Sequence, residues 1–259
     1  MNVNRNSLLG RTADITIDRQ LGSRNIRHRN ITYSIQLGHF AAEKKSGKIK
    51  HLIYIIGAEN TSNTFKGTII CTIKRNDTNQ LLLVAAPEGK HFYEVQIREC
   101  LGFFEKQYKS DYEFYMTKSC GIILYRIVDD TVQFLVSRDK KSGRISLIKG
   151  GIEFGESEKE TAVREVLEKT GICAEISDDF RSEYVFGTSE HTREKSVFFM
   201  AEYGDVMLKT PEKSDYVLSA MTFEEAVRSL DYPQEIILLM EARDYYEQKR
   251  KSMCSDKRA

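Results

Sequence analysis

Tryptophan is absent from this chain of 259 residues, proline occurs only three times, and neither sign of charge dominates. The 39 basic and 38 acidic residues leave a formal net charge of +1. A nearly neutral chain has no overall field that would favour nucleic acid, a membrane surface or an acidic polymer. We therefore expect local clusters of residues, and not the charge of the whole chain, to select the binding partner.

Cysteine is also scarce, and no apolar run approaches the roughly 18 residues of a membrane-spanning helix. The five cysteines lie far apart, are odd in number and form no C-x-x-C pair, which indicates reduced thiols. They are Cys71, Cys100, Cys120, Cys173 and Cys254. The opening residues MNVNRNSLLGRTADITIDR contain no signal-peptide core, so we expect a cytoplasmic protein with no membrane partner.

With 41% hydrophobic residues, the chain suits one large or two modest domains, and we expect two, 1–112 and 113–259. In the first, short aliphatic and β-branched segments between polar residues predict strands, and the apolar spacing over Phe92–Gln107 predicts a helix. The predicted strands are Ile15–Asp18, Leu52–Ile56, Gly67–Arg75 and Leu81–Ala85. A small β-barrel closed by one helix, within an α+β protein, is the simplest architecture.

The stretch Lys149–Ile172, KGGIEFGESEKETAVREVLEKTGI, predicts a glycine loop followed by a short acidic helix. Ser157 and Glu160 form a capping box at the start of this helix, and Gly171 supplies the left-handed residue that ends it. The predicted apolar face consists of Ala162, Val163, Val166 and Leu167. The helix therefore has about three turns.

Carboxylates converge on this helix, because Glu165 and Glu168 are three residues apart and Glu156 precedes them in the loop. Crowded carboxylates raise one another's pKa unless a cation is present. Hard oxygen ligands suit magnesium, which in turn favours substrates that carry phosphate. The residues alone predict a magnesium and phosphate site.

Two apolar runs before the glycine loop, Cys120–Val128 and Val132–Ser137, are joined by Asp129 and Asp130. This pattern predicts a β-hairpin. After the acidic helix, Val197–Tyr203 predicts a buried strand. The loop and the helix thus lie within a set of strands.

Two further helices are predicted near the end of the chain. Thr222 and Glu225 form a capping box for a helix that ends at about Leu230, and Pro233 suits the first turn of a last helix. The inward-facing residues of the last helix are predicted to be Ile236, Ile237, Leu239 and Met240. The polar, basic tail after Lys249 is predicted to be disordered.

With these residues in place, Lys149–Ile172 resembles the Nudix box, G-x5-E-x7-R-E-U-x-E-E-x-G-U, in which U is aliphatic. The matching positions are Gly150, Glu156, Arg164, Glu165, Val166, Glu168, Gly171 and Ile172. The resemblance implies an α/β/α sandwich with a mixed sheet. It also implies a hydrolase that cleaves a pyrophosphate bond in a nucleoside diphosphate derivative with Mg²⁺, or alternatively Mn²⁺.

Lys169 departs from this pattern, because the family has its last glutamate at this position. An ammonium that points inward would weaken divalent-ion binding, since two charges about 4 Å apart interact by about 4 kcal/mol at an effective dielectric constant near 20. An ammonium that points outward would instead pair with Glu165, one helical turn away. The sequence leaves both arrangements open.

The resemblance assigns roles to the residues that match it. As metal ligands we expect the Lys149 carbonyl, Glu165, Glu168 and Glu156, and as catalytic residues Glu165, Glu168, Arg164 and Glu212. Glu212 enters this set because related hydrolases carry a further glutamate in a loop after the corresponding strand. For substrate binding we expect Lys149, Gly150, Gly151, Arg138, Tyr184 and Lys195, in which the cations meet phosphate and the tyrosine stacks on a base.

Within the Nudix family, Lys149–Glu156 and Lys195–Glu202 resemble hydrolases of diadenosine tetraphosphate and bacterial RNA 5′-pyrophosphohydrolases. The expected substrate is therefore a nucleotide, with a dinucleoside polyphosphate first and an RNA 5′ end as the one nucleic-acid alternative, and we expect a homodimer. Those relatives carry a tryptophan and prolines before the box, where this chain has Ile145–Ile148. The rival hypothesis is a nucleotide sensor that has lost the chemistry.

The first domain resembles family I inorganic pyrophosphatases over Ile17–Ser23, Tyr33–Phe40 and Leu83–Gly89. That family holds magnesium with many aspartates, whereas this chain has the basic segment Ser46–His51 at the corresponding place. Asp14, Asp18 and Asp77 are predicted to be surface or turn residues. We therefore expect a hydrolytically inactive domain, kept for dimerisation, regulation or binding of a phosphorylated ligand.

Overall fold

The computed structural model describes residues 5–24, 32–44, 47–59, 63–177, 179–204, 208, 211 and 213–256. The chain divides into two compact units, residues 1–117 with 186–194, and residues 118–185 with 195–259. The predicted boundary after residue 112 lies within a strand of the first unit, Ser110–Phe114. No described helix is both long enough and apolar enough to cross a membrane.

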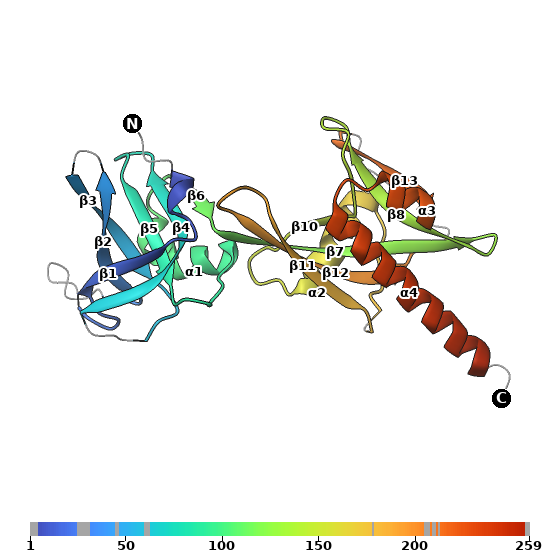
Figure 1. Ribbon diagram of the computed structural model, residues 1–259, viewed down its shortest axis with the longest axis horizontal. Helices are drawn as coiled ribbons and strands as arrows, with labels where there is room; N and C mark the ends of the chain where they lie inside the picture. Colours follow the sequence, from blue (N-terminus) through green and yellow to red (C-terminus); the bar gives the residue numbers. More distant parts are fainter. Residues whose placement is uncertain are drawn as a thin grey trace. The chain divides into compact units, whose positions relative to one another are not determined.

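Five strands of the first unit close into a barrel over the residues described there, in the order β1–β2–β3–β5–β4 with β4 returning to β1 (Figure 1). The elements are η1 (Arg5–Leu8), β1 (Thr12–Arg19), β2 (Gln36–Lys44), β3 (Gly47–Ile55), β4 (Thr64–Arg75), β5 (Leu81–Ala86), α1 (Glu94–Glu105) and β6 (Ser110–Phe114). β3 and β5 run parallel, and β6 pairs antiparallel with the second half of β4, beyond the part that pairs with β1. The predicted barrel with one closing helix is confirmed.

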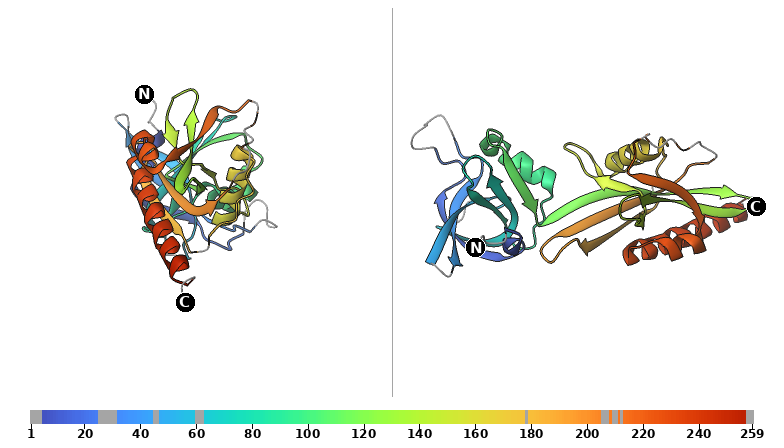
Figure 2. Two further views of the ribbon diagram at one scale, coloured as in Figure 1. Left: turned by 90° about the vertical axis from the view of Figure 1, so that its right-hand side faces the viewer. Right: turned by 90° about the horizontal axis from the view of Figure 1, so that it is seen from above.

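Alternation of apolar residues along the barrel strands gives the first unit two layers of core. One set packs with Leu8 of η1 and includes Ile15, Ile53, Ile69 and Leu83. The other set, which includes residues of β3, β4 and β5, packs against Ile97 and Leu101 of α1. Figure 2 shows α1 outside the barrel, so the first set fills the interior and the second attaches the helix.

β2 was not predicted as a strand, because its sequence QLGHFAAEK contains residues with low strand propensity. The predicted surface positions of the three aspartates are confirmed. Asp14 is exposed, Asp18 is exposed and accepts from His39 Nδ1 at 3.0 Å, and Asp77 lies exposed in the turn between β4 and β5. None of the three is buried, so these aspartates do not form the converging group that a metal site of the pyrophosphatase type needs.

The sheet of the second unit has the strand order β11–β12–β7–β8–β13 within the described residues, with β10 paired to β7 and β9 paired to β8. The strands are β7 (Met116–Val128), β8 (Thr131–Asp139), β9 (Ile145–Ser146), β10 (Lys149–Gly151), β11 (Arg181–Gly187), β12 (Arg193–Glu202) and β13 (Tyr216–Thr222). The helices are α2 (Glu158–Thr170), α3 (Phe223–Ser229) and α4 (Pro233–Asp256). β7 and β8 form the predicted hairpin, with Asp129 and Asp130 at positive φ in its turn.

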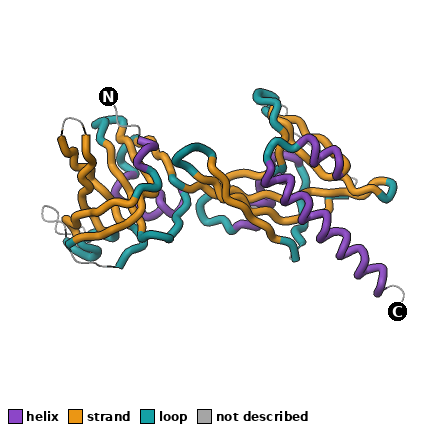
Figure 3. Tube along the Cα trace, in the orientation of Figure 1, coloured by secondary structure: helices purple, strands orange, loops and turns teal. Residues whose placement is uncertain are grey.

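Alternate residues of the central strands divide the core of the second unit between two faces of the sheet. Ile122 and Leu124 of β7 pack with Ala162 and Val166 of α2. Ile123 lies on the other face, with residues of α3 and α4. Both views of Figure 2 show α2 and α4 on opposite sides of the strands, and Figure 3 shows strands and helices in separate colours. The predicted mixed α+β class is confirmed.

Three predictions about the helices of the second unit are wrong. Ile237 and Met240 do not face inward, being 58% and 43% exposed, and the buried stripe of α4 is Leu238, Leu239 and Ala242. Leu167 of α2 is 47% exposed. The residues after Lys249 were predicted to be disordered, but α4 continues through them as far as Asp256.

Candidate functional site

The acidic helix begins and ends where its capping residues place it. The Ser157 hydroxyl accepts from the Glu160 amide at 3.3 Å, and the Glu160 carboxylate accepts from the Ser157 amide at 2.8 Å. Gly171 adopts φ 73° and donates its amide to the Leu167 carbonyl. These local contacts orient α2 so that Glu165 points towards β10.

Gly150 allows the Glu165 carboxylate to lie against the backbone of β10. A Cβ atom at this position would overlap the carboxylate. Gly150 pairs with Cys120 of β7, so the strand itself is fixed by the sheet. The absence of a side chain at position 150 therefore determines where the buried glutamate of α2 can sit.

Arg164 joins the glycine loop to the helix through its planar guanidinium. Its Nε and Nη2 atoms lie 2.5 and 2.9 Å from the two oxygens of Glu156, and Nη1 lies 2.9 Å from Glu165 Oε1. Nη2 also donates to the Gly151 carbonyl. The hydrogen bonds from Arg164 lower the pKa of Glu156 to about 2, so this carboxylate is ionised and braces the loop.

Lys169 contacts two of the predicted metal ligands at once. Its Nζ atom lies 3.0 Å from Glu165 Oε2 and donates a hydrogen bond to the Lys149 carbonyl. The two arrangements left open by the sequence are therefore combined, since the ammonium pairs with Glu165 and also points to the loop. Only 11% of the Glu165 side chain is exposed, between Lys169 on one oxygen and Arg164 on the other.

Glu168 stays at the surface, with 58% of its side chain exposed and its carboxylate 3.5 Å from Arg164 Nη1. In the part of the chain that the structure describes, no three His, Cys, Asp or Glu side chains are placed to hold a metal ion together. As the side chains lie, the site does not fit a divalent cation, because Lys169 takes the carbonyl and one carboxylate oxygen. The metal-ligand roles of Lys149, Glu165, Glu168 and Glu156 remain predictions.

The side chain of Lys149 enters a buried polar cluster, whereas its carbonyl faces Lys169. Lys149 Nζ lies 3.0 Å from Ser196 Oγ, 3.2 Å from the Tyr184 hydroxyl and 3.7 Å from Glu235 Oε1. Glu235 is fully buried, and burial raises its pKa. Its second oxygen accepts from the Leu147 amide at 2.7 Å.

Neither Glu235 nor Ser196 was predicted to belong to the site. In the structure Glu235 lies on the buried stripe of α4, four residues before Leu239. The sequence did not show that stripe, since Ile236, Ile237, Leu238, Leu239 and Met240 form one continuous apolar run. Ser196 had no distinguishing signal.

A second line of charges follows the start of α2 and the edge strand β11. Arg181 Nε lies 2.9 Å and Lys118 Nζ 2.6 Å from the Glu158 carboxylate, and Lys195 Nζ lies 2.6 Å from Glu183. Hydrogen bonds from Arg181, followed by those from Lys118, lower the pKa of Glu158 to about 2. Arg181 also reaches Glu183 at 2.7 Å, so these five side chains are continuous.

The predicted substrate residues are only partly brought together. Lys149 and Tyr184 are in contact, Gly150 and Gly151 follow in the same strand, and Lys195 adjoins Ser196 on β12. Arg138 is exposed on β8, opposite Val217 of β13. Glu212 lies outside the described residues. The substrate roles of all six residues, and the catalytic role of Glu212, remain predictions.

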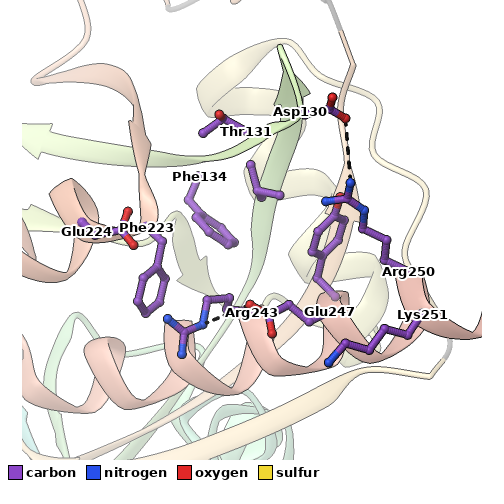
Figure 4. Close-up of a pocket in the computed structure, with 11 residues that line it drawn as sticks. Asp130, Thr131, Phe134, Phe223, Glu224, Arg243, Glu247, Arg250 and Lys251 are labelled. Atoms are coloured by element: carbon purple, nitrogen blue, oxygen red, sulfur yellow. Dashed lines mark ion pairs between the residues drawn. The ribbon is translucent and has the colours of Figure 1, made fainter.

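A groove of about 550 Å³ in the second unit contains none of the predicted site residues (Figure 4). Its floor includes Phe134 and Phe223, and the Arg243 guanidinium lies 4.0 Å above the Phe223 ring. Asp130 and Arg250 form an ion pair at 3.8 Å across its edge. The aromatic and charged groups of this groove are thus largely paired with one another.

The second unit is a mixed α+β unit built around a capped acidic helix, a glycine loop and a buried glutamate. Residues 118–240 match the family described as NUDIX domain, so the chain carries a Nudix domain over this range and the predicted resemblance is confirmed. We call the second unit the Nudix unit. The pyrophosphatase resemblance concerns residues outside this match and remains a prediction.

Several solved structures are similar to part of the chain. An Ap4A hydrolase from C. elegans in a binary complex is 18% identical, with a TM-score of 0.48, over 51% of this chain and 98% of that one. A NUDIX hydrolase from Listeria monocytogenes is 17% identical, with a TM-score of 0.44, over 51% and 94%. The NUDIX domain of Shewanella oneidensis NrtR, complexed with ADP ribose, is 15% identical, with a TM-score of 0.43, over 57% and 97%. No curated protein sequence matches the chain.

Proposed function

We propose that the Nudix unit binds a nucleoside diphosphate derivative, with a dinucleoside polyphosphate as the first candidate, and that the wild-type chain is a non-catalytic sensor rather than a hydrolase. The observation that carries this proposal is the position of Lys169. Its ammonium contacts both Glu165 and the Lys149 carbonyl, where the family resemblance expects a metal ion. A tethered cation keeps the buried carboxylate neutralised but supplies no activated water.

Phosphate groups of such a ligand need cations other than Lys169, because Lys169 neutralises the buried Glu165 carboxylate. The line formed by Lys118, Arg181 and Lys195 offers three positive charges against the two of Glu158 and Glu183. Lys195 and Arg181 share Glu183, so either can turn to an anion while the other keeps the carboxylate paired. A phosphate beside these groups would gain charge-assisted hydrogen bonds.

Hydrolysis is the second candidate, and the intact array around Arg164 favours it. Arg164 fixes Glu165 at the glycine loop, and Glu168 stays exposed at the surface. If an incoming divalent ion displaced Lys169, these two carboxylates and the Lys149 carbonyl would be the oxygens that the family resemblance assigns to it. The two candidates differ in one measurable property, the turnover of the wild-type chain.

Binding and turnover of a panel of nucleotides separate the candidates. We expect wild type to bind a dinucleoside polyphosphate or another nucleoside diphosphate derivative in EDTA, and to hydrolyse none with Mg²⁺ or Mn²⁺. Lys169→Glu restores an acidic oxygen at this place and is expected to gain hydrolysis that depends on the divalent ion. Lys159→Glu makes the same charge change at an exposed position of the first turn of α2 and is expected to gain none.

If the wild-type chain hydrolyses a nucleotide, the variant Glu165→Gln tests whether the Nudix site is responsible. Wild-type turnover that Glu165→Gln abolishes would establish the hydrolase and contradict the sensor. Absence of binding to every member of the panel would contradict both.

A further inference from the structure

The first unit contains a pocket of about 420 Å³ between barrel residues and the end of α1, which we call the aromatic pocket. Its size lies in the range of sites for small ligands. Tyr33, Tyr54 and Arg75 come from the barrel side, and Phe103, Phe104 and Tyr108 come from the last turn of α1 and the turn that follows. All of these residues belong to the first unit, so the pocket is separate from the Nudix site.

Aromatic rings form much of the wall. Tyr33 and Phe104 lie parallel, with centroids 6.0 Å apart, and Tyr54 lies 5.9 Å from Phe104. Phe103 meets Phe104 edge-on and is 58% exposed. A large apolar ring at the rim of a pocket presents a face on which a planar ligand can stack.

The charges of the pocket decide which kind of ligand fits. Glu105 is only 2% exposed, and its carboxylate accepts from Arg75 Nη2 at 2.6 Å and from the Tyr54 hydroxyl at 2.6 Å. Arg75 Nε donates to the same carboxylate at 3.1 Å. The negative charge is therefore already matched by protein groups, and Lys106, exposed at the rim, adds a positive charge.

An aromatic cage with an available carboxylate would suit an organic cation. Here the carboxylate is occupied, and the Arg75 guanidinium lies 3.7 Å from the centre of the Tyr108 ring, where an organic cation would have to lie. The excess charge of the pocket is positive. Its chemistry favours an anion that carries a planar ring.

We infer that the aromatic pocket binds a planar heteroaromatic ring with a phosphate group, the chemistry of a mononucleotide. The ring stacks on Phe103 at the rim, and the phosphate meets Lys106. The Arg75 guanidinium, whose Nη1 donates to Gln80 Oε1 at 3.2 Å, adds positive charge without direct contact. The buried bonds between Glu105, Arg75 and Tyr54 hold the guanidinium in place before the ligand arrives. This inference is independent of the proposed function of the Nudix unit.

Calorimetric titration of the full chain with adenosine 5′-monophosphate tests the inference. Wild type is expected to bind the probe, and Phe103→Ala and Lys106→Ala are each expected to weaken binding about tenfold or more, as loss of a stacking or a charge-assisted contact does. Both side chains are exposed, so these variants keep the barrel core. Lys66→Ala removes an exposed lysine from β4, outside the pocket, and is expected to bind as wild type does.

Adenosine and inorganic phosphate, titrated separately, are each expected to bind at least tenfold more weakly than the nucleotide. Equal binding of adenosine would contradict the phosphate contact, and equal binding by Phe103→Ala and Lys106→Ala would place the probe elsewhere and overturn the inference. Glu165→Gln and Lys169→Glu in the Nudix unit should leave this affinity unchanged. A loss of binding in those two variants alone would assign the probe to the Nudix unit instead.

Discussion

At position 169 a single substitution relative to the family pattern changes the electrostatics of the Nudix box. Four glutamates of the loop and helix, Glu153, Glu156, Glu165 and Glu168, lie within 4 Å of a nitrogen of Arg164. Lys169 adds a second cation on the side of Glu165 that Arg164 does not reach. Each oxygen of the buried Glu165 carboxylate thus has a cationic partner within the protein, so its burial needs no external ion.

Glu156 gives a prediction about acid stability. Its pKa is about 2 in the folded chain, below the ordinary value of 4.5, so it contributes stability above pH 4.5 that is lost as the pH falls towards 2. In urea titrations, the midpoint of the Nudix unit should fall steeply between pH 5 and pH 2.5. Glu156→Gln should start from a lower midpoint at pH 7 and show a shallower fall.

The matched control for this experiment is Glu224→Gln, which removes an exposed carboxylate from the first turn of α3. It should keep the pH dependence of wild type. The same steepness in Glu156→Gln would show that acid sensitivity comes from other carboxylates, of which Glu158 is the first to examine because its pKa is also about 2.

Among the elements of the Nudix unit, α4 connects the last part of the chain to the start of the glycine loop. Its first turn carries Glu235, which accepts the Leu147 amide and faces the ammonium of Lys149. The Lys149 carbonyl receives Lys169 on the other side. α4 therefore positions β10, which is distant in sequence, and with it the Lys149 carbonyl that Lys169 contacts.

We predict that replacing the Glu235 carboxylate lowers the stability of the Nudix unit. Glu235→Gln keeps an oxygen for the Leu147 amide but leaves Lys149 without its buried countercharge, which typically costs about 3 kcal/mol. Chemical denaturation should show this decrease, whereas Glu247→Gln at an exposed position of α4 should stay within about 0.5 kcal/mol of wild type. Equal stabilities of the two variants would mean that Tyr184 and Ser196 suffice to hold Lys149.

Local contacts explain which elements the sequence could predict. The start and end of α2 depend on residues within a few positions of each other, Ser157 with Glu160 and Gly171 with Leu167, so both were predicted correctly. The turn at Asp129 and Asp130 is equally local. The inward face of α4 was not predictable, because its apolar run has no period and the buried docking of Glu235 selects the face.

The same distinction applies to the candidate site. Arg164, Glu165 and Glu168 are neighbours on one helix, and their grouping follows from helical spacing. The contact of Lys169 with the Lys149 carbonyl spans 20 residues, and that of Glu235 with Leu147 spans 88. The sequence allows two directions for Lys169 and does not select one, since the choice depends on where β10 lies.

For the whole molecule, each hydrophobic core belongs to one unit. Both clusters of the first unit lie within residues 8–115, and both clusters of the Nudix unit lie within residues 120–246. Burial of apolar surface is the main source of folding stability. Two separate sets of buried surface therefore predict two cooperative units of unfolding.

A matched pair of leucines tests this prediction. Leu101 of α1 and Leu239 of α4 are both fully buried, each in the core of one unit. A leucine-to-alanine change in a core typically costs 2–5 kcal/mol, which lowers a melting temperature by several degrees or more. In calorimetric scans of the full chain, Leu101→Ala should lower one transition and Leu239→Ala the other. A single transition that both variants lower equally would show that the two cores unfold together. If two transitions are seen, a nucleotide that binds the Nudix unit should raise the one that Leu239→Ala identifies.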